Sequence, residues 1–327
     1  GDWSSDVCSS DLLPTLYYIY NSIVVFFILG LSAIHGSSLN RVFFWSVAVS
    51  SLAQFAMVVA RMDFTSFRQV GFFNNPNQLG YYSLINLAII AVTNREVKTS
   101  RGFLAVIIVI NVFLVMLSNS KAALISSVII VVPVFLQLFR RGRFRRTQLT
   151  FLIVLLPVLI IVLMIYSSSI LSFTETVFQN TQRRLSMIGM DSDDNLTGRG
   201  YGRIALYPEF ILFGAAEGIG PEKDPRYDDP YMGGEIHSTF GTLLFSYGFI
   251  GLAAFVALLI FVTDFGSLVS IASVGAISLY SLTHQGLRFT NVWIFLVVAY
   301  LVKPRSKIVN KQRKLLNELV NKEEVRF

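Results

Sequence analysis

The stretch FGTLLFSYGFIGLAAFVALLIFVT, residues 240–263, decides the fold, because it contains no Asp, Glu, Lys or Arg. A helix needs about 20 predominantly apolar residues to cross the hydrocarbon core of a bilayer. The whole chain has the same character: 54% of its 327 residues are hydrophobic and only 14% are charged. Soluble globular domains do not have these proportions. The sequence therefore predicts an all-α polytopic membrane protein.

Other apolar stretches have the length of a membrane span, and together they predict nine transmembrane helices. The expected spans are residues 16–34, 42–60, 76–93, 103–117, 122–139, 149–166, 240–263, 268–283 and 289–302. The third span has a readable start, because Asn75 can cap a helix and Pro76 suits its first turn, where no N–H is needed.

The first residues do not look like part of the fold. DWSSDVCSSDL, residues 2–12, resembles a translated sequencing adapter. We therefore interpret residues 1–12 as an artefact and expect the chain to be truncated at its N-terminus. Cys8, the only cysteine, lies in this segment. Without the segment the chain has no cysteine, so we expect no disulfide, thiolate nucleophile or cysteine metal ligand.

Basic residues predict the orientation in the membrane. Most of the 27 Lys and Arg residues lie in alternate connections, at 35–41, 94–101 and 140–146, and in the tail 303–327. Cytoplasmic segments carry the positive excess, so these are assigned to the cytoplasm. The tail also spaces its apolar residues like a basic helix resting on anionic lipid. We expect a multi-pass protein of the bacterial inner membrane with a cytoplasmic C-terminus.

The opposite side receives one large hydrophilic loop. Residues 13–166 hold the first six spans, residues 240–302 hold the last three, and residues 167–239 connect them. Loops of this length are usually functional or disordered. The stretch IALYPEFILFG, residues 204–214, is apolar enough to pack on the membrane surface. We expect a small ordered cap over the outer face.

Two arginines of this loop are candidates for binding an anion. Arg199 and Arg203 lie in LTGRGYGRIALYPEF. The glycines allow the backbone to approach a ligand, and the planar guanidinium matches two phosphate oxygens. Simple solvation of a loop surface is the alternative interpretation.

Histidines mark the border between the loop and the spans. His237 precedes the seventh span, where it either packs against the helix end or acts as a general base, since imidazole can accept a proton near neutral pH. Glu235 lies two residues away and could orient the ring. His284, at the outer end of the eighth span, is a second candidate.

No metal site is expected. Asp191 and Asp193 form a D-x-D pattern of the kind that holds a divalent cation under a nucleotide sugar, but the loop is too short for the domain that usually presents it. A calcium-binding loop fails as well, because Leu196 occupies the required glycine position.

Four motifs in a fixed order resemble the O-antigen ligase and O-antigen polymerase family of membrane glycosyltransferases. They are GFFNNPNQLGYYSL at 71–84, SNSKAALISS at 118–127, TGRGYGRI at 197–204 and EIHSTFGTLLFSYGFIGL at 235–252. The resemblance implies that a glycan is transferred from undecaprenyl diphosphate at the periplasmic face. The acceptor is lipid A core in a ligase and a growing polysaccharide in a polymerase, both in lipopolysaccharide or related polysaccharide biosynthesis.

The resemblance also implies roles for individual residues. His237 matches the proposed base that activates the acceptor hydroxyl, and either Arg199 or Arg203 matches a diphosphate-binding arginine. Lys121 stands where many members have arginine. Arg68 and Arg288 are further basic candidates on the outer side for the same diphosphate. The family is viewed as inverting and metal-independent, so we expect no cofactor; membrane lipid is an expected partner and nucleic acid is not.

Two other classes of protein compete with the enzyme. A lipid-linked oligosaccharide flippase or other transporter would tend to show ionisable residues inside its spans and an internal repeat. Neither is found in the sequence, apart from the uncertain start of the ninth span near Arg288. A non-catalytic protein that binds glycan precursors would use the same arginines and stays open.

Overall fold

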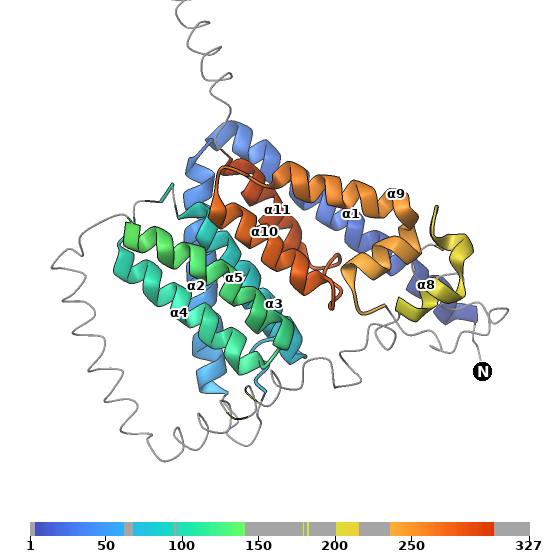
Figure 1. Ribbon diagram of the computed structural model, residues 1–327, viewed down its shortest axis with the longest axis horizontal. Coiled ribbons are helices and arrows are strands. Elements are labelled where there is room, and N and C mark those ends of the chain that lie inside the picture. Colours follow the sequence, from blue (N-terminus) through green and yellow to red (C-terminus); the bar gives the residue numbers. More distant parts are fainter. Residues whose placement is uncertain are drawn as a thin grey trace, which may run out of the picture.

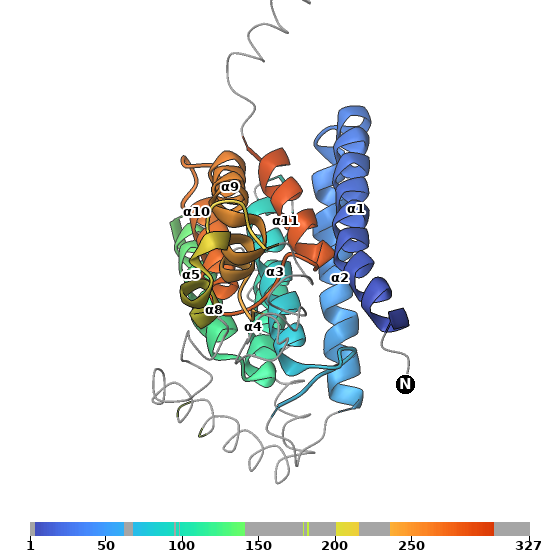
Figure 2. The ribbon, with the colours of Figure 1, turned by 90° about the vertical axis from the view of Figure 1, so that its right-hand side faces the viewer.

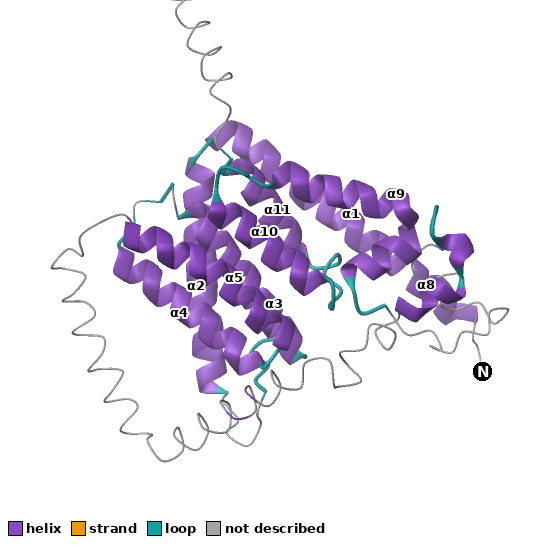
Figure 3. Cartoon of the chain, in the orientation of Figure 1, coloured by secondary structure: helices purple, strands orange, loops and turns teal. Residues whose placement is uncertain are grey.

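The computed structural model describes residues 4–61, 68–94, 96–97, 99–140, 179, 182, 201–215 and 236–303, and within these ranges every regular element is helical (Figures 1 and 3). The longer helices are α1 (Ser4–His35), α2 (Ser38–Ala60), α3 (Pro76–Thr93), α4 (Arg101–Ser118), α5 (Lys121–Arg140), α9 (Thr239–Val262), α10 (Leu268–Ser281) and α11 (Thr290–Leu301). The short helices α8 (Gly202–Leu206) and η3 (Pro208–Phe210) lie between α5 and α9 in the chain.

Eight of the nine expected spans coincide with helices, with most ends shifted by no more than a few residues. The third span, 76–93, is matched at both ends, and the Asn75 side chain accepts a hydrogen bond from the Asn77 N–H at 2.8 Å, as a cap should. The sixth span, 149–166, lies outside the described residues. α1 begins earlier than expected, at Ser4. The assignment of residues 1–12 to an adapter stays a prediction.

Four described helices are long and apolar enough to cross a membrane. They are Thr15–His35 within α1, Ser38–Ala60, Arg101–Ser118 and Thr239–Val262. The apolar helices Lys121–Gln137, Leu268–Ser281 and Thr290–Leu301 are shorter. At about 1.5 Å per residue, a helix of 14 residues rises only about 21 Å. The all-helical membrane fold is thus confirmed, while the count of nine spans stays a prediction.

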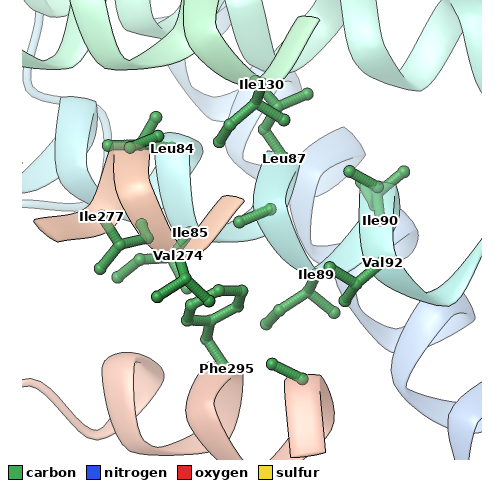
Figure 4. Close-up of a cluster of buried hydrophobic side chains, with 14 of the residues drawn as sticks. Leu84, Ile85, Leu87, Ile89, Ile90, Val92, Ile130, Val274, Ile277 and Phe295 are labelled. Atoms are coloured by element: carbon green, nitrogen blue, oxygen red, sulfur yellow. The ribbon is translucent and has the colours of Figure 1, made fainter. Parts of the chain in front are cut away.

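α3 is the centre of the bundle. It packs against α2, α4, α5, α10 and α11, and from Leu79 to Thr93 every residue except Tyr82 is buried. Figure 4 shows Leu84 and Leu87 gathered with Ile130 of α5, and Phe295 of α11 on the opposite side of the same cluster. A helix that is covered all round carries no polar stripe.

The surface of the bundle is apolar and part of its interior is polar. Large apolar side chains point outward from α1, α2, α5 and α9, among them Phe26, Val49, Val128 and Ile260. Figure 2 shows α1 and α2 side by side at one edge of the bundle. Contiguous apolar surface on this scale requires an apolar solvent, which agrees with a membrane location.

The interior polar groups join three helices. Asn86 of α3 donates to the Ser51 hydroxyl of α2 at 3.2 Å, and that hydroxyl donates to the Asn111 side chain of α4 at 3.1 Å. All three side chains are buried. Polar side chains inside a membrane bundle hydrogen-bond across helices in this way because lipid offers them no partner.

Alternate connections lie at the same end of the bundle, as the charge pattern predicts. At one end, Asn40 donates to the Glu96 carboxylate, so the α1–α2 and α3–α4 connections meet. At the other end, the Gln69 N–H donates to the Leu117 carbonyl at 2.9 Å, so the segment before α3 meets the α4–α5 turn. Which end faces the cytoplasm stays a prediction.

The seventh span is a broken helix rather than the continuous one expected over 240–263. At Gly248 the backbone turns to φ 66° and ψ −173°, and the direction of α9 changes. The Phe249 N–H donates to the Ile211 carbonyl at 2.6 Å, while the Phe245 carbonyl accepts from the Ala215 N–H at 2.8 Å. The segment 211–215 therefore supplies hydrogen-bond partners for the backbone groups on both sides of the break.

Replacing Gly248 with alanine should destabilise the protein by about 1–3 kcal/mol, the cost of forcing an ordinary residue into a rare backbone region. A Cβ atom at this position would lie 2.3 Å from the Leu212 carbonyl oxygen. Thermal unfolding in detergent measures the effect. Gly275→Ala in α10 is the matched control, since no atom lies within 4 Å of its Cβ position. Equal melting temperatures for both variants would contradict the expectation.

Candidate functional site

One end of the bundle gathers the polar connections. Residues 68–75, 118–121, 236–239 and 282–289 are linked there by hydrogen bonds, and this end is called the site end below. These polar residues directly follow or precede apolar helices, so the ends of those helices hold them in place.

Thr239, the first residue of α9, fastens the α10–α11 connection to the start of α9. Its hydroxyl donates to the His284 carbonyl at 3.0 Å and accepts from the Gly286 N–H at 2.9 Å. Its own N–H donates to the same His284 carbonyl at 3.1 Å. The residues before α9 and those after α10 therefore form one unit.

His237 is exposed, while its neighbours Ile236 and Ser238 are buried. The Ser238 hydroxyl accepts from the Gly241 N–H at 3.0 Å, which caps α9, and lies 3.3 Å from the Ser281 carbonyl. Ile236 packs in a small apolar cluster with Phe245. The backbone of His237 is thus anchored on both sides, and its side chain faces outward at the site end.

The described loop residues 201–215, called the cap segment below, contact the same place. The Tyr201 hydroxyl hydrogen-bonds with the Ser238 hydroxyl and donates to the Leu282 carbonyl at 3.0 Å. Carbonyls in the last turn of a helix have no N–H partner within that helix. The Tyr201 hydroxyl supplies a donor at the end of α10, because it donates to Leu282 while it accepts from Ser238. Figure 1 shows α8 beside the first half of α9.

His284 stands at the end of a stack of three rings. The Tyr81 and Tyr280 rings lie 4.2 Å apart at 11°, and the Tyr280 and His284 rings 4.3 Å apart at 19°. The Tyr280 hydroxyl donates to the Asn77 carbonyl at 3.0 Å, and His284 Nδ1 lies 2.9 Å from the Thr283 hydroxyl. This half-buried imidazole has a fixed orientation.

Arg68 is tied to the same network. Its Nε donates to the Ser118 carbonyl at 3.1 Å and its Nη2 to the Asn77 side chain at 2.7 Å. Asn77 thus connects Arg68 with Tyr280 and, through the ring stack, with His284. Lys121 opens α5 in the adjoining turn, and its side chain is partly exposed.

Arg203 is fully buried, at 0% exposure. Its guanidinium carbon lies 5.7 Å from the centroid of the Phe245 ring, a cation–π distance. Phe245 belongs to the cluster that also contains Ile236, so Arg203 and His237 border the same packed group. Arg203 joins the cap to α9, and its guanidinium is closed to solvent.

The site end is basic. Within residues 68–75, 118–121, 236–239 and 282–289, the charged side chains are Arg68, Lys121 and Arg288, and none is acidic. A concentration of positive charge with few compensating acids attracts an anionic ligand. The part of the chain that the structure describes contains no group of three or more His, Cys, Asp or Glu side chains able to hold a metal ion.

The structure places the predicted residues as follows. His237, His284 and Arg68 lie at the site end, where the hydrogen bonds of Thr239, Tyr280 and Asn77 link the segments that carry them. Arg288 lies in the same α10–α11 connection, and the side chain of Asn21 approaches its carbonyl at 3.5 Å. Arg199, Glu235 and the D-x-D pattern at 191–193 lie outside the described residues. The catalytic and binding roles stay predictions.

Several residues of the site escaped sequence reasoning. Thr239, Tyr280, Asn77 and Tyr201 hold the candidate residues in place, yet none is charged or histidine. Asn77 carried a faint signal, because it follows the cap Asn75 and Pro76 within a polar NNPNQ run. Nothing in the sequence indicates that Tyr280 stacks on Tyr81, because the two residues are 199 positions apart in the chain.

Fold and site together define a polytopic membrane protein with a basic, histidine-containing site at one end of its helical bundle. Residues 104–256 match the family described as O-antigen ligase, a range from α4 into the second half of α9. The match confirms the resemblance seen in the sequence and supports the assignment of the chain to the O-antigen ligase and polymerase family, with a role in surface polysaccharide synthesis. No curated protein and no solved structure matches the chain.

Replacing Thr239 with valine should destabilise the site end by about 1–3 kcal/mol, because the isosteric change leaves the buried Gly286 N–H without its acceptor. Thr239→Ser retains the hydroxyl and is the control. Melting temperature and glycan transfer are measured on both variants. If Thr239→Val matched Thr239→Ser in both, the fastening of the α10–α11 connection by this hydroxyl would be refuted.

Proposed function

We propose that the protein transfers a glycan from undecaprenyl diphosphate to an acceptor hydroxyl at the periplasmic face of the bacterial inner membrane. The observation that carries this proposal is the exposed His237, anchored before the start of α9 at the end of the bundle that also carries Arg68 and Lys121. The family assignment supports the reaction class. The acceptor is either lipid A core or the end of a growing polysaccharide.

In the proposed reaction His237 removes the proton of the acceptor hydroxyl. The acceptor oxygen then attacks the anomeric carbon of the donor sugar and forms the new glycosidic bond. The bond from that carbon to the diphosphate breaks, its electron pair stays on the diphosphate oxygen, and undecaprenyl diphosphate leaves. One displacement inverts the anomeric centre and needs no protein nucleophile. Glu235 is proposed to orient the imidazole.

Basic residues are proposed to stabilise the charge that develops on the leaving diphosphate. Preorganised cations do this without reorganisation at the moment of reaction, so the proposal needs no metal. Arg199, Lys121, Arg68 and Arg288 are the proposed ligands. Arg68 is already oriented by Asn77 and the Ser118 carbonyl, and a lysine such as Lys121 acts as a point charge rather than a fork.

The burial of Arg203 suggests a division of labour between the two loop arginines. Arg203 lies against Phe245 with no exposed surface, and an arginine in this position contributes packing as well as charge. We propose that Arg199 is the arginine that binds the diphosphate and that Arg203 positions the cap on α9.

A lipid-linked oligosaccharide flippase is the second candidate, and the break in α9 at Gly248 favours it. Discontinuous helices are typical of transporters. An assay in detergent distinguishes the two functions, because glycan transfer between detergent-solubilised donor and acceptor needs no sealed membrane, whereas translocation does. Transfer by purified protein in micelles supports the enzyme, and its absence alongside donor translocation in vesicles supports the flippase.

Replacing His237 with alanine should lower the rate of glycan transfer by about 10²–10⁴, the usual contribution of a positioned base. Purified protein is supplied with lipid-linked donor, and lipid A core and polysaccharide repeat units are offered as acceptors in separate reactions. Binding of undecaprenyl diphosphate should survive. His35→Ala is the control. His35 is an exposed histidine in the last turn of α1, at the end of the bundle opposite the site end. Full activity in the His237 variant would remove it from the mechanism.

The two loop arginines should respond differently to alanine. Arg199→Ala should raise KM for the donor and leave the melting temperature unchanged. Arg203→Ala should lower the melting temperature through a loss of about 1–3 kcal/mol, a typical effect of disrupting a buried contact. Steady-state kinetics and thermal unfolding are measured on both variants. The reverse pattern would make Arg203 the diphosphate ligand.

A further inference from the structure

The segment 206–213 combines an exposed apolar surface with backbone bonds into the middle of α9. Four of its side chains are large, apolar and exposed, and Phe213 is 74% exposed. They are Leu206, Ile211, Leu212 and Phe213. Loops that face water rarely present such a run, because apolar surface in water is unfavourable.

The backbone of this segment is joined to the break in α9. The Ile211 carbonyl accepts from the Phe249 N–H, and the Ala215 N–H donates to the Phe245 carbonyl, which would otherwise accept from Phe249 in a continuous helix. The Leu212 carbonyl lies so close to Gly248, and the Ser246 carbonyl to Gly214, that a Cβ on either glycine would lie 2.3 Å from the oxygen. The loop and the helix share one set of backbone hydrogen bonds.

Backbone hydrogen bonds between the segment and α9 are what a location in the hydrocarbon core of a bilayer requires. In water, a broken helix can leave its freed N–H and C=O groups to solvent, but in a bilayer each such group needs a partner within the protein. The Phe249 N–H and the Phe245 carbonyl find theirs in the inserted segment. Irregular backbone at membrane depth is tolerated where it is buried in protein or lines a water-filled cavity, and the backbone of 211–215 is held against α9 by these bonds.

The apolar surface continues from the segment onto α9. Phe249 and Ile250, directly after the break, are 59% and 57% exposed. α9 is long and apolar enough to cross a membrane, so these side chains belong to its lipid-facing surface. The side chains of 206–213 therefore adjoin a surface that lipid already covers.

We propose that residues 206–213 form a re-entrant wedge that inserts into the outer leaflet, with Leu212 and Phe213 in contact with lipid acyl chains and the exposed carboxylate of Glu209 at the level of the lipid headgroups. The wedge completes the broken helix α9 and fixes the depth of the cap. Arg203, three residues before the wedge, is buried against Phe245 and holds the start of α8 on α9. This proposal does not depend on the glycan-transfer reaction.

Spin labels test the depth of the wedge. In a background that carries Cys8→Ser, nitroxide labels are attached to Phe213→Cys, to Phe249→Cys as the lipid-facing reference and to Arg61→Cys as the aqueous reference, since Arg61 is exposed at the end of α2. The protein is placed in bilayers of phosphatidylethanolamine and phosphatidylglycerol. Collision rates with molecular oxygen, which concentrates in lipid, and with a water-soluble nickel chelate are then compared.

The label at 213 should match the label at 249, with frequent oxygen collisions and few nickel collisions. A label that matches position 61 places the segment in water and overturns the proposal. A label shielded from both reagents means that protein covers the segment, which overturns it equally. All three positions are exposed, so the melting temperatures of the labelled variants should equal that of the background, and this is checked first.

Discussion

The structure depends on one constraint: inside a bilayer, every backbone N–H and C=O must find its partner within the protein. Helices meet this requirement locally, and every regular element in the described ranges is a helix. Where α9 breaks at Gly248, the requirement reappears, and the backbone of 211–215 meets it. The cap segment 201–215 is therefore structurally continuous with the bundle, because part of its backbone completes helix α9.

The same constraint explains how the site end is assembled. Carbonyls at the end of α10 lack partners in their own helix, and hydroxyls from other segments supply them: Tyr201 at Leu282 and Thr239 at His284. Each bond that satisfies a helix end also brings two connections together. The exposed His237 owes its fixed place to these neighbours, since the residues on either side of it are buried and bonded. Support for the candidate site and satisfaction of the helix ends are the same set of hydrogen bonds.

A large share of the fold could be predicted from the sequence because apolar length and helix-start chemistry are local signals. The helix 76–93 was predictable at both ends from its apolar run and from Asn75 and Pro76. The break in α9 was not, because FSYGFIG belongs to a continuous apolar span and isolated glycines such as Gly248 and Gly251 are tolerated within helices. The burial of Arg203 also escaped prediction, since a glycine-rich arginine motif suggests an accessible anion site until its packing partner Phe245, more than 40 positions away, is known.

The sequence by itself determined that the chain is helical and suited to a membrane, where most of its helices begin and end, and which basic and histidine residues fall on one side. These properties depend on residues close together in the chain, or on simple alternation of the connections across a bilayer. Only the tertiary structure decided that α3 is enclosed by five helices, that His284 is stacked on Tyr280 and Tyr81, and that 211–215 enters the break in α9. All three features arise from contacts between segments that are distant in the chain. Packing and the need to pair buried polar groups decide which segments come together.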